Sequence, residues 1–326
     1  MNLRIVYLGT PDFAVEPLRC LLEKQRACDS CGYEIVGVVT MPDKMINKRG
    51  NQLLMSPVKQ YAVEQGLPVL QPESLKDEAF QDALRAWGAD LQIVVAFRML
   101  PESVWNMPRL GTFNLHASLL PQYRGAAPIN WAIINGDKET GVTTFFLKHE
   151  IDTGDVIFRD VVAIDENDNA GTLHDKLMLQ GGDTVMRTVE AIVNGSVSAI
   201  AQDDMCTCEL RPAPKIFRDT CRINWSGNVD GIYNFVRGMS PYPAAWCELV
   251  KSNGDAIALK VYAVSREYAL HCKTVGTILT DNKSYIKVAV EGGYVSFDEV
   301  QLAGKKRMPV ADLLRGFSLE GIECVK

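Results

Sequence analysis

Residues 3–11 read Leu3-Arg4-Ile5-Val6-Tyr7-Leu8-Gly9-Thr10-Pro11, and this stretch indicates the fold class. Its apolar first part predicts a buried strand, and the glycine and proline that follow predict a tight turn. After the turn, apolar residues recur at helical spacing, at Phe13, Val15, Leu18, Leu21 and Leu22. A strand that turns directly into an amphipathic helix is the usual opening of an α/β protein.

The rest of the N-terminal half continues this alternation. Strands are predicted at 34–40 and 89–96, both rich in Val and Ile, with a helix near 56–65 between them. Such strands favour a parallel sheet covered on both faces, so we expect an α/β fold with a Rossmann-like N-terminal half. The turn after the first strand lacks the G-x-G-x-x-G spacing of dinucleotide-binding proteins, which argues against a nicotinamide oxidoreductase.

The character of the sequence changes after residue 201. Residues 202–215 are polar, include two prolines and are predicted to form a linker. Beyond them, short β-type runs are predicted at 245–249, 256–262, 274–280, 284–289 and 295–300. Strands at this spacing favour a small barrel. We therefore expect one domain over 1–201, a linker over 202–215 and a barrel domain over 216–326.

The composition is that of an ordinary globular protein, with 47% apolar and 23% charged residues among 326. No apolar stretch is long enough to span a membrane and the first residues do not resemble a signal peptide, so we expect a cytoplasmic protein. Nine cysteines are an odd number for a disulfide framework. The pairs Cys28/Cys31 and Cys206/Cys208 have no histidine nearby, so no metal site is predicted.

The net charge of −6 is unevenly divided along the chain. Residues 210–326 hold 16 Lys and Arg against 12 Asp and Glu, a surplus of +4, whereas residues 1–209 hold 18 against 28. This asymmetry permits the C-terminal part to bind a polyanion while the N-terminal part performs chemistry.

A polar group interrupts the otherwise apolar N-terminal half. Residues 112–116 alternate like the end of a strand, so Asn114 and His116 share one face. An Asn amide can donate to a developing oxyanion while a histidine handles a proton. A carboxylate such as Asp152 can hold the imidazole in one tautomer. Together these three residue types predict acyl-type transfer.

The motifs around these residues resemble those of the 10-formyltetrahydrofolate-dependent formyltransferases, and the resemblance covers nearly the whole chain. The matching segments are Gly9-Thr10-Pro11-Asp12-Phe13-Ala14, Ser56-Pro57-Val58-Lys59, Gly66-Leu67-Pro68-Val69, Asn114-Leu115-His116, Ser118-Leu119-Leu120-Pro121, Tyr123-Arg124-Gly125-Ala126-Ala127-Pro128, Asp152-Thr153-Gly154-Asp155 and Ala303-Gly304-Lys305-Lys306. The resemblance implies a Rossmann-like formyltransferase domain followed by an OB-like β-barrel.

The resemblance also implies roles for individual residues. Asn114, His116 and Asp152 match the catalytic positions. The cosubstrate, 10-formyltetrahydrofolate, is expected to lie against residues 118–121 on one side and residues 94–101 on the other. At 94–101 the chain departs from the common pattern, in which Gly follows the aromatic residue. The folate-binding residues are then expected to be Ser118, Leu119, Leu120, Pro121, Phe97 and Met99.

The acceptor that the resemblance implies is the α-amino group of methionyl-initiator-tRNA, and the formylated product serves translation initiation. The residues expected to contact this tRNA are Lys44, Lys48 and Arg49, in a basic loop over 41–51, and Lys305 and Lys306 near the end of the chain. We expect the protein to act as a monomer, without a metal and without a membrane partner.

The residues leave two other functions open. A formyltransferase of the same superfamily that acts on an amino sugar nucleotide would share the three polar residues and differ in the appended domain. A non-catalytic RNA-binding protein is less favoured, because Asn114, His116 and Asp152 are all present and the barrel sequence lacks an obvious run of stacking aromatic residues.

Overall fold

The computed structural model describes residues 2–28, 31–46, 52–205 and 209–326. Backbone contacts divide the chain into two compact units. The first comprises Met1–Gly125, Thr140–Val162 and His174–Pro212, and the second comprises Ala126–Glu139, Ala163–Leu173 and Ala213–Lys326. Two segments that precede residue 174 thus group with the C-terminal part. No helix in the described residues is both long and apolar enough to cross a membrane.

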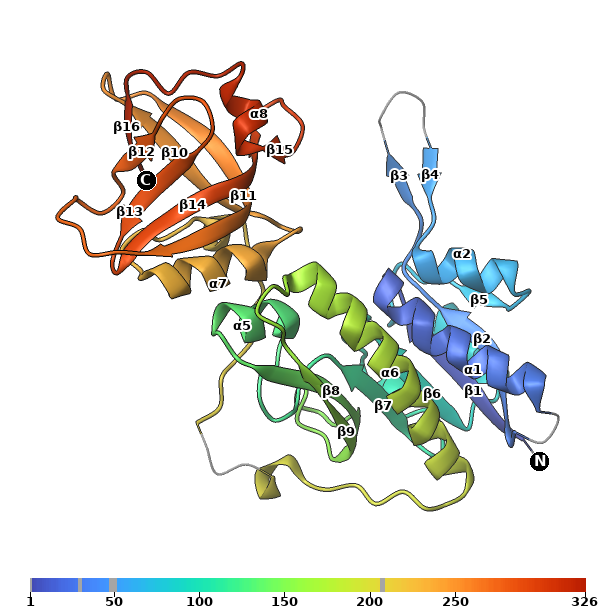
Figure 1. Ribbon diagram of the computed structural model, residues 1–326. Helices are drawn as coiled ribbons and strands as arrows, with labels where there is room; N and C mark the ends of the chain where they lie inside the picture. Colours follow the sequence, from blue (N-terminus) through green and yellow to red (C-terminus); the bar gives the residue numbers. More distant parts are fainter. Residues whose placement is uncertain (1, 29–30, 47–51, 206–208) are drawn as a thin grey trace. The chain divides into compact units, whose positions relative to one another are not determined.

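The first unit is built on a seven-stranded sheet with strand order β5-β2-β1-β6-β7-β8-β9 (Figure 1). Its strands are β1 (Leu3–Gly9), β2 (Tyr33–Val39), β5 (Val69–Leu70), β6 (Leu91–Val95), β7 (Thr112–His116), β8 (Glu139–Phe146) and β9 (Val156–Ala163). Strands β5, β2, β1, β6 and β7 are parallel, as expected. At one edge the sheet is mixed, because β8 pairs with β7 in the antiparallel direction.

Helices cover both faces of this sheet. Along β1, Val6 and Leu8 point to one side and pack with Phe80 and Leu84 of helix α3 (Glu78–Ala86) and with Val104 of α4 (Glu102–Trp105). Helices α1 (Val15–Ala27) and α6 (Ala170–Val193) lie over the other face (Figure 1). Helix α2 (Pro57–Glu64) is capped by Ser56, whose side chain accepts a hydrogen bond from the Lys59 amide.

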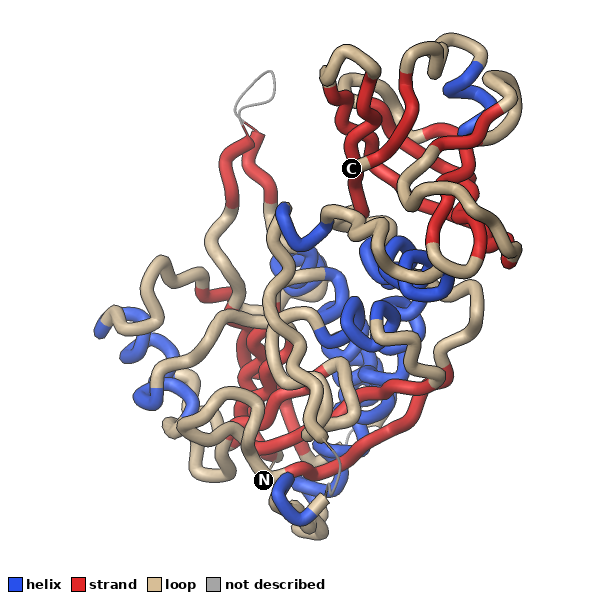
Figure 2. The backbone as a smooth tube through the Cα atoms, turned by 90° about the vertical axis from the view of Figure 1, so that its left-hand side faces the viewer, coloured by secondary structure: helices blue, strands red, loops and turns tan. Residues whose placement is uncertain are grey.

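The basic segment expected to be a loop over 41–51 contains part of a short hairpin. Strands β3 (Lys44–Ile46) and β4 (Gln52–Leu54) pair in the antiparallel direction, with Met45 opposite Leu53. Figures 1 and 2 show this hairpin extending away from the sheet. Three-residue strands are too short for an alternating pattern to be recognised, which explains why the sequence predicted only a loop. Lys48 and Arg49 lie outside the described residues.

The second unit contains an antiparallel sheet that nearly closes on itself, and this barrel-like form agrees with the expected barrel. Its strand order is β12-β13-β14-β11-β10-β16, with β15 paired to β14. The strands are β10 (Ala245–Lys251), β11 (Ala256–Tyr268), β12 (Ile278–Thr280), β13 (Ile286–Val290), β14 (Gly293–Leu302), β15 (Met308–Pro309) and β16 (Ile322–Val325). The last strand approaches the first strand of the sheet, because the Val325 amide donates to the Gly276 carbonyl at 2.9 Å and Thr277 bridges to Cys324 just before β12.

Helices complete this unit. Helix α7 (Val229–Met239) packs against α5 (Pro128–Ile134), and the Asn130 side chain donates to the Gly238 carbonyl at 2.7 Å. A short helix, α8 (Val310–Leu314), follows β15. The buried side chains of this unit form one cluster in which the rings of Trp225 and Phe297 lie 5.9 Å apart. The unit therefore has a hydrophobic core of its own.

Candidate active site

Two of the expected catalytic side chains lie at the carboxyl end of β7. Residues 114 and 116 share one face of the strand, as the alternation predicts. His116 is 7% exposed, whereas Asn114 is half-buried. Within the described residues the side-chain amide of Asn114 has no hydrogen-bond partner. A partly accessible amide without a protein partner is free to donate to a ligand.

The position of the His116 proton follows from one backbone contact. Its Nε2 lies 2.9 Å from the carbonyl oxygen of Tyr123. A carbonyl only accepts, so Nε2 carries the hydrogen and the neutral ring has its lone pair on Nδ1. Nδ1 lies 4.0 Å from Oδ2 of Asp152, which is beyond hydrogen-bond range. The Tyr123 carbonyl therefore sets the tautomer, whereas the sequence predicts this role for Asp152.

Asp152 is held beside the imidazole by backbone contacts. Its Oδ2 accepts a hydrogen bond from the Gly125 amide at 3.0 Å, and its side chain is 14% exposed. The carboxylate lies on the same side of the imidazole as Nδ1, the ring nitrogen that has the free lone pair. The geometry thus favours His116 as a group that takes up a proton at Nδ1.

Three non-glycine residues at this site have left-handed backbone conformations. Ala96 follows β6 with φ of 47°, Tyr123 has φ of 60°, and Asp152 has φ of 57°. Such conformations cost of order 1–3 kcal/mol each and persist only where the surrounding structure holds them. Their concentration around His116 is typical of functional sites.

The strand order predicts a ligand-binding position at the carboxyl ends of the strands, where His116 also lies. The chain order reverses at β1, because β2 lies on one side of β1 and β6 lies on the other. Ligands of open α/β sheets bind at the carboxyl ends of the strands beside such a reversal. The turn that begins at Gly9 and the loop that begins at Ala96 follow these two strands. The Thr10 hydroxyl is buried there without a partner among the described residues.

The segment expected to bind folate, residues 118–121, is mostly part of the protein interior. The Ser118 hydroxyl donates to the Gln122 carbonyl at 2.6 Å, and Leu120 packs with Phe145 and Val156. Pro121 is also buried, whereas Leu119 is half-buried. The side chains of Ser118, Leu120 and Pro121 therefore shape the loop, and Leu119 is the most accessible of the four.

The other expected folate wall borders a hollow of about 510 Å³. Met99 is 76% exposed at this hollow, whereas Phe97 packs partly into the core around β6. The Arg98 guanidinium donates to the carbonyls of Pro72 and Glu73 and lies over the Phe97 ring. The residues that line the hollow are Glu73, Ser74, Leu75, Lys76, Arg98, Met99, Leu100 and Pro101.

The basic residues expected to contact tRNA lie in both units. Lys44 is exposed on β3 of the first unit. In the second unit, Lys305 and Lys306 are exposed on the turn that joins β14 to β15, and no carboxylate among the described residues pairs with them. The neighbouring Arg307, in contrast, is paired with Glu299.

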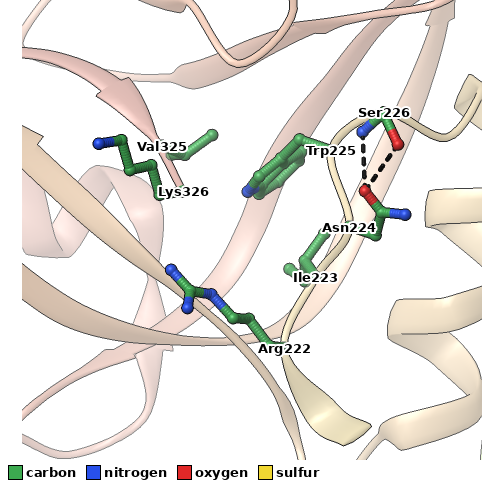
Figure 3. Close-up of a pocket in the computed structure, with 7 residues that line it drawn as sticks. All are labelled: Arg222, Ile223, Asn224, Trp225, Ser226, Val325 and Lys326. Atoms are coloured by element: carbon green, nitrogen blue, oxygen red, sulfur yellow. Dashed lines mark hydrogen bonds between the residues drawn. The ribbon is translucent and has the colours of Figure 1, made fainter. Parts of the chain in front are cut away.

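A second hollow, of about 410 Å³, lies on the barrel unit (Figure 3). Figure 3 shows Arg222 and Lys326 around the indole of Trp225, whose Nε1 is buried without a partner among the described residues. Arg222 is already paired with Glu248 at 2.6 Å. The hollow therefore offers few free polar groups to a ligand.

The described residues contain no cluster of three or more His, Cys, Asp or Glu side chains that could hold a metal. No such cluster includes Cys28 or Cys31, and Cys206 and Cys208 lie outside the described residues. Sequence reasoning missed Tyr123, Gly125 and Gln202 as groups that hold the site. The first two stand in the quoted Tyr123-Arg124-Gly125 motif, which was a signal for them, whereas nothing in the sequence pattern pointed to Gln202.

The sequence matches the family described as formyl transferase over residues 3–189 and the C-terminal domain of that family over residues 215–318. The methionyl-tRNA formyltransferase of Bacteroides thetaiotaomicron is 63% identical over 319 residues, which are 98% of this chain and 97% of that protein. That of Flavobacterium psychrophilum is 48% identical over 316 residues, which are 97% of this chain and 96% of that protein.

Solved structures share the fold. WlaRD, a sugar 3N-formyl transferase, covers 94% of this chain and 100% of its own with a TM-score of 0.63 and 17% identity. HypX from Aquifex aeolicus, solved in complex with tetrahydrofolic acid, covers 99% of this chain and 48% of its own with a TM-score of 0.62 and 18% identity. At these identities the likeness concerns the fold alone. The two family matches and the full-length identity to methionyl-tRNA formyltransferases show that this chain belongs to the formyl transferase family.

Proposed function

We propose that this chain transfers the formyl group of 10-formyltetrahydrofolate to the α-amino group of methionyl-initiator-tRNA. The products are N-formylmethionyl-tRNA, for translation initiation, and tetrahydrofolate. The observation that carries the proposal is an unengaged Asn114 amide beside a His116 imidazole whose Nδ1 faces Asp152. Relatives that are 48% to 63% identical over nearly the whole chain are methionyl-tRNA formyltransferases, so the amino sugar nucleotide alternative is not favoured.

The three polar residues divide the chemistry between them. The α-amine attacks the formyl carbon, the carbonyl oxygen becomes an oxyanion, and collapse breaks the bond to N10, which takes up a proton. The Asn114 amide donates to the oxyanion. His116 accepts the proton of the attacking amine at Nδ1 and returns it toward N10. Asp152 stabilises the imidazolium between these two transfers.

The hollow beside residues 98–101 supports a folate site. Its lining joins the apolar Met99 and Leu100 to the cationic side chains of Arg98 and Lys76. A folate has aromatic rings at one end and carboxylates on its glutamate tail, so this combination suits it. In this proposal Phe97, Met99 and Leu119 contact the rings, while Ser118, Leu120 and Pro121 contribute backbone groups.

Exposed lysines support a tRNA surface. Lys44, Lys305 and Lys306 are accessible, and Lys48 and Arg49 belong to the same basic segment as Lys44. In this proposal the first compact unit, which holds most of residues 1–201 and the start of the expected linker at 202–215, is the catalytic domain, and the barrel unit, which holds residues 216–326, is the tRNA-binding domain. The protein acts as a monomer.

The proposal is tested by incubating the purified protein with 10-formyltetrahydrofolate and charged initiator tRNA. Release of tetrahydrofolate is followed, and the product is identified as N-formylmethionyl-tRNA after mild ester hydrolysis. Amino sugar nucleotides and uncharged tRNA serve as parallel acceptors. Formylation of a sugar amine in preference to methionyl-tRNA would overturn the proposal.

A further inference from the structure

The buried side chain of Gln202 joins the two loops that surround His116. Gln202 begins a single helical turn, η2 (Gln202–Asp204), and is 3% exposed. Its Nε2 donates to the carbonyl of Asp152 at 2.9 Å and to the carbonyl of Gly154 at 2.8 Å. Its Oε1 accepts from Nε of Arg124 at 3.0 Å and from Nη2 of Arg124 at 2.7 Å.

These four contacts use the whole hydrogen-bonding capacity of the side chain. A glutamine amide has two N–H donors and one oxygen that accepts twice. The orientation of this amide is unambiguous, because carbonyl oxygens only accept and a guanidinium only donates. No other side-chain type of this size supplies two donors and a neutral double acceptor in that arrangement.

Each of these hydrogen bonds connects Gln202 to a residue in, or next to, the candidate site. The carbonyls of Asp152 and Gly154 belong to the turn that carries the Asp152 carboxylate. The backbone of Asp152 has a φ of 57°, a conformation that the surrounding structure must hold. Arg124 lies between Tyr123, whose carbonyl orients His116, and Gly125, whose amide donates to Asp152. One buried amide therefore holds both loops in register.

We propose that Gln202 is a positioning residue that sets the direction and distance of Asp152 from the His116 imidazole. It touches neither of the reacting groups and acts through Asp152. The inference rests on the proposed formyl transfer for its kinetic consequences, whereas its structural consequence, a fixed Gly125–Asp152 hydrogen bond, holds independently.

The test uses Gln202→Glu in the full-length protein. The shape of the side chain is kept, but oxygen replaces nitrogen opposite the two carbonyls, so the Asp152 turn loses both donors and meets a repulsive charge. Misplacement of a reacting group by about 1 Å costs on the order of 10²-fold, and we expect a fall of that size in kcat with little change in KM for methionyl-tRNA. Gln202→Met removes the donors without adding charge. It is the variant to use if Gln202→Glu does not fold, and we expect the same fall in kcat.

A matched control separates positioning from general stability. Gln92 is a fully buried glutamine on β6 whose Oε1 lies 3.2 Å from the Thr112 hydroxyl, and no hydrogen bond among the described residues joins its side chain to the Asp152 turn. Gln92→Leu is expected to keep wild-type kcat at a temperature where it is folded. Equal losses of kcat in the Gln92 and Gln202 variants would overturn the proposal.

Two further readouts locate the effect at Asp152. In an Asp152→Asn background, Gln202→Glu is expected to lower kcat further by less than about threefold, because substitutions within one hydrogen-bond network do not have additive effects. A full multiplicative loss would contradict action through Asp152. Hydrogen exchange at the Gly125 amide is expected to be faster in Gln202→Glu than in wild type, and unchanged exchange overturns the inference even if the wild-type protein formylates a different acceptor.

Discussion

At the residue scale, the candidate site depends on which nitrogen of His116 carries the proton. The Tyr123 carbonyl requires a hydrogen on Nε2, so Nδ1 is the atom that can take up a proton. Asp152 faces that atom at 4.0 Å without a direct hydrogen bond. In the proposed mechanism the carboxylate therefore acts by its charge, so a substitution that removes only this charge should impair formyl transfer.

Asp152→Asn keeps the size of the side chain and removes the charge that stabilises the imidazolium. We expect kcat for formyl transfer to fall by about 10²–10⁴, the range of a general acid–base contribution, with normal folding. Asp155→Asn is the matched control in the same turn, since Asp155 pairs at the surface with Lys148 at 2.7 Å. Near-normal turnover of Asp152→Asn would remove Asp152 from the mechanism.

Asn114→Ala removes the amide that is free to donate to the oxyanion. Loss of one such donor costs about 10²–10³ in kcat, and we expect a decrease of that size with unchanged affinity for folate. The measurement is steady-state kinetics together with a folate titration. If only KM changed, Asn114 would be a binding residue.

At the element scale, helices α5 and α7 approach closely at one glycine. A Cβ added to Gly238 of α7 would lie 2.6 Å from Cγ1 of Ile134 and 3.1 Å from the Asn130 carbonyl oxygen. The backbone of α7 at Gly238 therefore packs directly against the Ile134 side chain of α5. Only a residue without a Cβ fits in this space.

Gly238→Ala tests this packing. Overpacking costs about 1–3 kcal/mol, and we expect it to exceed the helix-propensity gain of about 1 kcal/mol, so that the free energy of unfolding decreases. Gly231→Ala is the control in the same helix, because its added Cβ would approach only Oδ1 of Asn228, at 3.2 Å. Denaturant unfolding of both variants is the measurement, and a stabilised Gly238→Ala protein would show that the helices separate easily.

At the scale of the whole molecule, the chain combines an α/β unit, which we propose is catalytic, with a barrel unit whose Lys305 and Lys306 pair with no carboxylate among the described residues. The two compact units are not continuous in sequence, because Ala126–Glu139 and Ala163–Leu173 group with the barrel. A truncation after residue 202 would leave α5 without its partner helix α7. The tRNA contribution of the barrel is therefore better tested by charge substitutions in the full chain.

Replacing Lys305 and Lys306 together by Ala is expected to weaken binding of methionyl-tRNA and to leave folate binding unchanged. Each phosphate contact that is lost should reduce the slope of log K against log salt by about one unit, because fewer counterions are released. Lys283→Ala, at an exposed turn of the same unit, is the control. Equal salt slopes for the variant and the wild type would assign the tRNA surface to other residues.

The sequence by itself determined the features that depend on neighbouring residues. The strand–turn–helix opening, the shared face of Asn114 and His116 and the series of short C-terminal strands all follow from local periodicity, because side-chain direction repeats every two residues in a strand. The family resemblance of the motifs added the reaction and the candidate roles of Asn114, His116 and Asp152.

Only the tertiary structure decided how distant segments meet. The antiparallel direction of β8, the approach of β16 to the first strand of the barrel sheet and the contacts of Gln202 depend on the path of the chain. Gln202 reaches Asp152 across 50 positions and Arg124 across 78. Local propensity carries no record of such pairings, since a buried amide takes the partners that the folded backbone brings to it. For the same reason the tautomer of His116 was decided by a carbonyl, which every residue possesses and no sequence pattern distinguishes.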